Sequence, residues 1–578
     1  MTLRDRAVVG VLSLVLVVLT GAVVAPSFVP QRPVSTREPS PLTARPYVEG
    51  VLGTASSVSP FSARTPAERA MVALVFRGLV RLGPDDSLIG DLAERWEVDS
   101  TGATWTFHLR PGLVWQDGQP LTADDVLFTI EALSDPGYEG PGAESWREVI
   151  ASAPDASTVV LTLATPLGGF LEAATQPIAP RHLLAGIPPA DLLDDAFGRR
   201  PVGSGSFRLT ALDVRHAVLT PAVPDIIAPD EGIPGAGTPL PTDSLSTPAP
   251  TLPGGAPLPY LDGIELRFFE DPEALATAWA SGQLDGASGL APADAAALAQ
   301  TPGAHLLRYP TTTLLSVTLN LRPAHPEFRD AAVRRSLLAA IDRDAIIDMI
   351  FAGGATRADS PIPPTSWAFD AATSSPVAFD PAAARTGLAA AGWTEAAGGG
   401  WIAKGQSEAL TIELVGPEES ANPTSYAVAE AVAADWQAIG LTVAHTPLTG
   451  AALVADHLRT GEFSAAVVGM AIGLDPDLYP LLASSQVTAS GSNFAGLQDP
   501  ALDRLLVAAR APGKDEARKA AYVALQTQLA SAVYILPIAF RDEVVVVRDE
   551  LRGPQIRPIG SPGDRFWDVL TWRLADDR

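Results

Sequence analysis

The sequence predicts an α/β protein with more than one lobe, and three observations support this class. The chain has 578 residues, too many for one hydrophobic core, so roughly two to four lobes are expected. Hydrophobic residues make up 47% of the chain and charged residues 18%, so most of it can bury enough apolar surface to fold. Helical and strand patterns alternate through the second half, as they do in α/β domains.

The amino terminus predicts export. Arg4 and Arg6 precede 19 uncharged residues, Ala7 to Ala25. As a helix this run would span about 28 Å, close to a bilayer core of ~30 Å. A secretory h-region is shorter, roughly 7–15 residues, and Pro26 argues against cleavage beside it. The preceding arginines place the rest of the chain outside the cell membrane. We expect residues 1–25 to form an uncleaved transmembrane anchor; a long cleaved signal peptide is the alternative.

Two segments lack the periodic pattern of apolar residues that a helix or a strand would show. Residues 26–46 are rich in Pro and Ser and predict a semi-extended tether, so the globular body is expected to begin near Tyr47. Residues 221–259 contain many prolines, which cannot donate to a strand ladder and which interrupt helices. They predict a surface loop or a disordered insertion; a partner contact is the less favoured alternative.

The segment from Thr104 to Leu133 predicts a strand, a hairpin and a helix. In "TWTFHL" the apolar residues alternate with polar ones, as in a half-buried strand. "RPG" predicts a turn, "LVW" a returning strand and "QDGQP" a second turn. Thr122 and Asp125 have the spacing of a capping box at the start of a helix. Val126, Ile130 and Leu133 would form the apolar stripe of that helix.

Later segments repeat this alternation. Asp380 is expected to be the N-cap of a helix with Pro381 at its first position and Gly392 just beyond its end. "YAVAEAVAADWQAIG" predicts a helix closed by Gly440, and "LTVAHTPL" predicts a strand. "DEARKAAYVALQTQLASAVYILP" predicts a long helix that ends before Pro537, and "EVVVVRDEL" another strand.

No motif in the sequence requires catalysis. Cysteine is absent, which excludes disulfides, thiolate metal sites and cysteine nucleophiles. The histidines show no close metal-ligand spacing, and no nucleophile elbow occurs. Gly203 and Gly205 predict a turn before the strand "FRLTAL". The net charge of −26 disfavours nucleic acid as a partner, because binding phosphates needs Lys and Arg.

Several collinear motifs resemble the peptide/nickel class, family 5, of extracytoplasmic solute-binding proteins of ABC importers. The motifs are "FRGLVRLGPDDSLIGDLAERWEVDSTGATWTFHLRPGLVWQDGQPLTADDVLFTIEAL", "PVGSGSFRL", "LATAWASGQLDGA", "VTLNLRPAHPEFRDAAVRRSLLAAIDRDAII", "FDPAAARTGLAAAGW" and "GLDPDLYPLLASS…GSNFAGLQDPALDRLL". The resemblance implies a bilobal periplasmic-binding-protein type II-like fold with an extra inserted domain. The first lobe would be split into residues 47–84, 199–310 and 533–578. The inserted middle domain would comprise residues 85–198, and the continuous second lobe residues 311–532.

The resemblance also implies where a ligand would bind. Peptide-binding members often carry an aspartate just before the Asp-Pro segment, which pairs with the peptide's α-amino group; Ile472 stands there instead. Asp475 and Asp477 are alternative partners for a cation, although a role as a turn N-cap explains either about equally well. Four further residues match positions near the cleft or hinge of such proteins: Asn493, Phe494, Phe540 and Arg541. Ala22 stands where a lipoprotein would have its lipidated cysteine, so a lipid anchor is not expected.

The expected function is to capture oligopeptides or a similar small solute between two lobes and to deliver it to an ABC permease. We expect a monomer tethered on the outer face of the membrane or in the periplasm, with no enzymatic activity, metal, cofactor or nucleic-acid partner. One alternative is a ligand-sensing ectodomain of the same fold. Another is a binding protein for a non-peptide solute such as a sugar or a metal chelate.

Overall fold

The computed structural model describes residues 45–222, 261–489, 491–512 and 515–575. The predicted anchor at 1–25 lies outside these residues, as do nearly all of the predicted tether at 26–46 and the Pro-rich segment at 221–259. Within the described part of the chain, no helix combines the length and the apolar character that crossing a membrane requires. The described residues from 45 to 574 form one compact unit.

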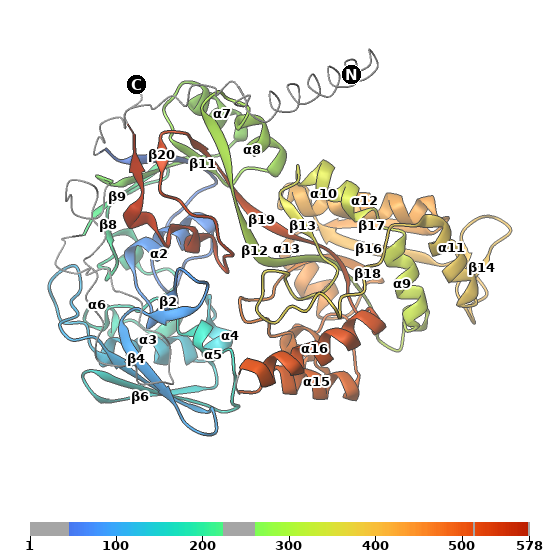
Figure 1. Cartoon of the computed structure of the whole chain (residues 1–578), viewed down its shortest axis with the longest axis horizontal. Helices are drawn as coiled ribbons and strands as arrows, with labels where there is room; N and C mark the ends of the chain where they lie inside the picture. Colours follow the sequence, from blue (N-terminus) through green and yellow to red (C-terminus); the bar gives the residue numbers. More distant parts are fainter. Residues whose placement is uncertain (1–44, 223–260, 490, 513–514, 576–578) are drawn as a thin grey trace, which may run out of the picture. The chain divides into compact units, whose positions relative to one another are not determined.

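The largest sheet of the described residues has 11 strands, in the order β17-β16-β18-β12-β19-β11-β1-β10-β9-β8, with β13 also paired to β19. Its two longest strands are β12 (Ala304–Leu319) and β19 (Leu536–Arg548), which run antiparallel in the middle of this order (Figure 1). The others are β1 (Tyr47–Leu52), β8 (Phe207–Leu212), β9 (His216–Pro221), β10 (Ile264–Phe269), β11 (Gly286–Ser288), β13 (Ala355–Arg357), β16 (Thr411–Pro417), β17 (Thr442–Leu448) and β18 (Ala465–Ala471).

A separate antiparallel sheet has the order β4-β5-β7-β6. Its strands are β4 (Ala93–Val98), β5 (Thr104–Leu109), β6 (Val149–Asp155) and β7 (Thr158–Leu163). Three two-stranded pairs complete the strands of the described chain: β2 (Val80–Leu82) with β3 (Leu88–Gly90), β14 (Thr394–Glu395) with β15 (Trp401–Ile402), and β20 (Leu551–Arg552) with β21 (Arg573–Leu574).

Helices fill the connections, and three of the described ones, α7, α11 and α15, begin at an aspartate followed by proline. The described α-helices are α2 (Pro66–Val75), α3 (Ala123–Ser134), α4 (Ala143–Trp146), α5 (Phe170–Ala173), α6 (Arg181–Leu184), α7 (Pro272–Ala280), α8 (Pro292–Leu298), α9 (Ala331–Ala339), α10 (Arg343–Ile350), α11 (Pro381–Ala390), α12 (Pro423–Ala438), α13 (Gly450–Ala452), α14 (Tyr479–Leu482), α15 (Pro500–Arg510) and α16 (Asp515–Ala532). A short 3₁₀ helix, η7 (Pro562–Phe566), lies near the carboxyl end. The alternation of helices and strands confirms the predicted α/β class.

Buried apolar side chains form two large cores and one small one. The first core draws on residues from Tyr47 to Tyr309 and from Val545 to Leu574. The second core draws on residues from Leu314 to Phe540. A third, smaller core surrounds Trp279. The main sheet is continuous between the two large cores, because β12 and β19 each contribute side chains to both. The predicted domain boundaries, including those of the inserted domain at 85–198, stay predictions.

Most of the local predictions for Thr104–Leu133 are confirmed. β5 buries Trp105, Phe107 and Leu109 and turns its other side chains outward, and α3 follows as predicted. The N–H of Thr122 donates to Asp125 Oδ2 at 2.8 Å, which is one half of a capping box. The predicted hairpin is wrong. β5 pairs with β4 and β7, which already occupy both of its edges, so the returning segment forms only an isolated bridge between Val114 and Pro120.

The start of α11 is also confirmed, and it gives a test of local stability. Asp380 Oδ1 accepts a hydrogen bond from the N–H of Ala383 at 2.8 Å, and Gly392 has the left-handed φ of +93° just beyond the helix. Replacing Asp380 by alanine is expected to lower the free energy of unfolding by about 1 kcal/mol, because an orphan N–H loses its acceptor. Urea denaturation measures this change. Asp380→Asn, which keeps an acceptor, should cost much less; an equal loss in both variants would contradict the capping role.

Candidate functional site

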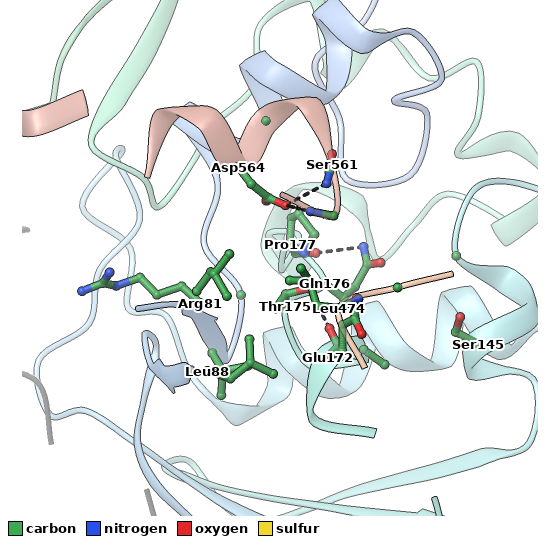
Figure 2. A pocket seen from close by; sticks show the side chains of 18 of the residues that line it. Arg81, Leu88, Ser145, Glu172, Thr175, Gln176, Pro177, Leu474, Ser561 and Asp564 are labelled. Carbon is green, nitrogen blue, oxygen red and sulfur yellow. Dashed lines mark hydrogen bonds between the residues drawn. The ribbon is translucent and has the colours of Figure 1, made fainter. Parts of the chain in front are cut away.

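A cavity of about 1570 Å³ is lined by residues of both large cores. The wall on the side of the first core comes from α2, the β2–β3 hairpin, α5 and η7. The opposite wall comes from the segment that follows β18 and from the end of α15. Figure 2 shows Arg81 and Leu88 of the hairpin together with Glu172, Leu474 and Asp564 around this space. Segments distant in the sequence therefore line one cavity.

Ile472, which stands at the position of the family's aspartate, lies in the cavity wall, and its contact with a ligand stays a prediction. Its side chain is only 4% exposed and belongs to the second core. Its N–H donates to the carbonyl oxygen of Thr312 at 3.1 Å, which fixes the backbone at the end of β18. An apolar side chain here offers a ligand van der Waals contact and no charge.

Asp475 and Asp477 also line the cavity, and each is paired with an arginine. Asp475 accepts two hydrogen bonds from the guanidinium of Arg518, both at 2.8 Å. Asp477 Oδ2 accepts one from Arg510 at 2.9 Å, and its Oδ1 accepts from the N–H of Tyr479 at 3.0 Å. Burial raises the pKa of Asp477, and the charge of Arg510 opposes this shift. The negative charges of this segment are therefore balanced within the protein itself.

The other four predicted residues are not part of the cavity wall. Asn493 is 2% exposed, and its side-chain amide donates to the carbonyl oxygens of Ala483 and Leu497 at 2.9 and 3.0 Å, so it shapes its own loop. Phe494 is half-buried against the second core. Phe540, in β19, is buried in that core, and its neighbour Arg541 is exposed. Their contact with a ligand stays a prediction.

Glu172, on α5, is a site residue that the sequence did not indicate. Its Oε1 accepts a hydrogen bond from the N–H of Leu474, and its Oε2 accepts one from the N–H of Asp475, both at 2.9 Å. Burial raises the pKa of Glu172, and the nearby charges of Asp475 and Asp564 raise it further, whereas the two N–H groups lower it. No local pattern marks this residue, because its partners are 302 and 303 positions away.

Asp564 is a second acidic wall residue that the sequence analysis missed. Its Oδ2 accepts from the N–H groups of Gly560 and Ser561 at 3.0 and 2.8 Å, as Figure 2 shows for Ser561. Burial raises the pKa of this carboxyl, opposed by those two hydrogen bonds. A signal was present here: Ser561 and Asp564 have capping-box spacing at the start of η7.

The arrangement is suited to holding a molecule. The wall combines apolar side chains with a smaller number of polar and charged groups, which is typical of ligand sites. Within residues 45–222, 261–489, 491–512 and 515–575, no group of three or more His, Asp or Glu side chains is placed to hold a metal ion.

Comparisons with known proteins agree with this geometry. Residues 87–492 match the model of the bacterial extracellular solute-binding proteins, family 5 Middle. A putative ABC transporter peptide-binding protein of Brucella ovis is 27% identical over 451 residues, which cover 75% of this chain and 76% of the relative.

Two solved structures share the fold. The oligopeptide-binding protein AppA of Bacillus subtilis, in complex with a nonapeptide, has a TM-score of 0.71 at 20% identity, covering 93% of this chain and 100% of that one. NikZ of Campylobacter jejuni, in complex with Ni(L-His), has a TM-score of 0.70 at 21% identity, covering 91% and 99%. These likenesses confirm the predicted type II-like α/β fold. Because the family model matches more than half of the sequence, the chain belongs to the bacterial extracellular solute-binding proteins of family 5.

Proposed function

We propose that the protein captures oligopeptides or a similar small solute in this cavity and delivers them to an ABC permease. The observation that carries the proposal is the cavity itself, which is lined from both large cores in a chain of the family-5 class. Its volume of about 1570 Å³ exceeds the roughly 300–1,000 Å³ of common small-molecule pockets, so an extended ligand has room. Peptide binding by AppA and the name of the Brucella relative support a peptide.

A non-peptide solute is the second candidate, and one feature of the cavity favours it. Ile472 replaces the expected aspartate, and the carboxylates of Asp475 and Asp477 are engaged by Arg518 and Arg510. A free α-amino group would therefore lack its usual partner in this segment. The Ni(L-His) complex of NikZ shows that a protein of this fold can hold such a solute.

The cellular setting is part of the same proposal. We place the chain as a monomer on the outer side of the cell membrane, held by the apolar segment Ala7–Ala25. Such a tether would keep the binding body near its permease without a lipid anchor. The protein acts by binding and release, with no chemical conversion of the ligand.

Native mass spectrometry of the full chain, extracted in mild detergent without refolding, tests the ligand class. We expect excess mass that denaturation releases as a series of peptides. A single non-peptide solute would retain the transport role and replace the peptide assignment. A protein that purifies empty and is not thermally stabilised by peptide pools, sugars or metal chelates would contradict capture of a solute.

A further inference from the structure

One contact in the cavity wall joins the two large cores directly. Phe170, 2% exposed, anchors α5 in the first core, and Ile472, 4% exposed, anchors the segment after β18 in the second. Between these anchors, the two carboxylate oxygens of Glu172 accept from the N–H groups of Leu474 and Asp475, each at 2.9 Å. The carboxylate therefore connects elements that are packed into different cores.

A second hydrogen bond and two glycines support this contact. The N–H of Gly168 donates to the carbonyl oxygen of Arg510 at 2.8 Å, again between the two cores. A Cβ atom added to Gly169 would lie 2.8 Å from Asp475 Cγ, so only glycine fits there. Gly473 has a φ of +85°, and a Cβ there would lie 3.2 Å from Glu172 Oε2. Both sides of the contact therefore have the small residues that a close approach requires.

The acid next to Glu172 is itself paired with an arginine, which reduces the repulsion at this contact. Asp475 would repel Glu172, but Asp475 is paired with Arg518 through two hydrogen bonds of 2.8 Å. The guanidinium of Arg518 also lies 4.8 Å from the ring centroid of Trp367, which holds it in place. Hydrogen bonds to an ionised acceptor are roughly twice as strong as neutral ones. The contact therefore stabilises the arrangement in which the two walls of the cavity lie close together.

We propose that Glu172 is a latch that holds the two walls of the cavity together before any ligand is bound. Both donors of the latch belong to the protein, so closure does not depend on a group of the ligand. Capture and release would then require the latch to open. This last consequence rests on the proposed function, whereas the latch itself can be tested in the ligand-free protein.

Hydrogen exchange of the full chain, stripped of ligand, measures the latch at its donors. In Glu172→Ala, we expect the amides of Leu474 and Asp475 to exchange at least about tenfold faster, the effect of losing one hydrogen bond to a charged group. Glu172→Gln retains one acceptor oxygen and should give an intermediate increase. Glu131→Gln is the matched control, because Glu131 is exposed on α3 and lies outside the cavity wall. Unchanged exchange at these two amides, or an equal increase throughout the chain, would overturn the latch.

A distance measurement tests closure itself. The chain has no cysteine, so spin labels can be placed by Glu131→Cys and Lys519→Cys, two exposed positions on α3 and α16. Electron–electron double resonance should show one main distance with Glu172 intact and an added, longer population with Glu172→Ala. Identical distributions would overturn the proposal. Neither readout requires a ligand, so failure of the latch can be told apart from failure of solute capture, which native mass spectrometry reports.

Discussion

Replacing Arg565 by methionine is expected to lower the free energy of unfolding by about 3–5 kcal/mol, because an unpaired charge would be left in the first core. Arg565 donates to both carboxylate oxygens of Glu49, at 3.0 and 2.6 Å. The two side chains are 5% and 0% exposed. Burial opposes protonation of Arg565, but the charge of Glu49 outweighs it and raises the pKa of Arg565 above its usual value. Tyr47 and Ser288 also donate hydrogen bonds to Glu49, so the arrangement of these side chains depends on Arg565 balancing the charge of Glu49.

Urea denaturation of the full chain measures this loss. The control is Asp344→Asn, which removes the ion pair between Asp344 and Arg357. The side chain of Asp344 is 68% exposed, and such surface pairs contribute roughly 0–1 kcal/mol. Adding Glu49→Gln to Arg565→Met should recover part of the stability, because the double variant no longer buries an unpaired charge. A loss below that of the surface control would show that water reaches Glu49 in the folded protein.

Replacing Trp436 by alanine is expected to cost about 3–5 kcal/mol in the second core. The side chain lies on α12 and is 0% exposed. Its removal would leave a cavity that the surrounding residues can fill only in part. Its Nε1–H also donates to the carbonyl oxygen of Leu337 at 3.0 Å, and that oxygen would lose its partner. The lost packing and the lost hydrogen bond therefore both lower the free energy of unfolding.

Guanidinium denaturation, followed by circular dichroism, measures the effect of Trp436→Ala. Trp436→Phe keeps most of the ring volume and loses only the donor, so it should cost clearly less than alanine. Hydrogen exchange should place the lost protection between Leu314 and Phe540, the span of the second core. Loss of protection spread equally over the first core would show that the two cores unfold as one unit.

Local features of the fold could be predicted from the sequence because neighbouring residues determine them. Asp380, Pro381 and Gly392 specify the start and end of α11 through side-chain and backbone chemistry within one or two turns. The burial pattern of β5 follows from alternation alone. The failed hairpin after β5 shows the limit of this approach. Turn residues indicate where a chain reverses, but the strands that occupy each sheet edge come from elsewhere in the sequence.

The candidate site was predictable only in part, for the same reason. The alignment of one Asp-Pro segment pointed to Ile472, Asp475 and Asp477, which all line the cavity, although their contact with a ligand stays a prediction. It could not show that arginines on α15 and α16 pair with the two aspartates. Glu172 follows no motif, and its role depends on donors 302 and 303 residues away. Only the folded chain brings such groups together.

The pairing of Glu49 with Arg565, 516 residues apart, also constrains when the protein can finish folding. β1 lies between β10 and β11 in the main sheet, and the other edge of β11 pairs with β19 near the carboxyl end. During synthesis from the amino end, Glu49 cannot pair with Arg565 until almost the whole chain has been made. Contacts of such long range make folding slow. In a protein of an extracellular family, a first core that is completed only by the carboxyl end would leave the chain less compact while it crosses the membrane.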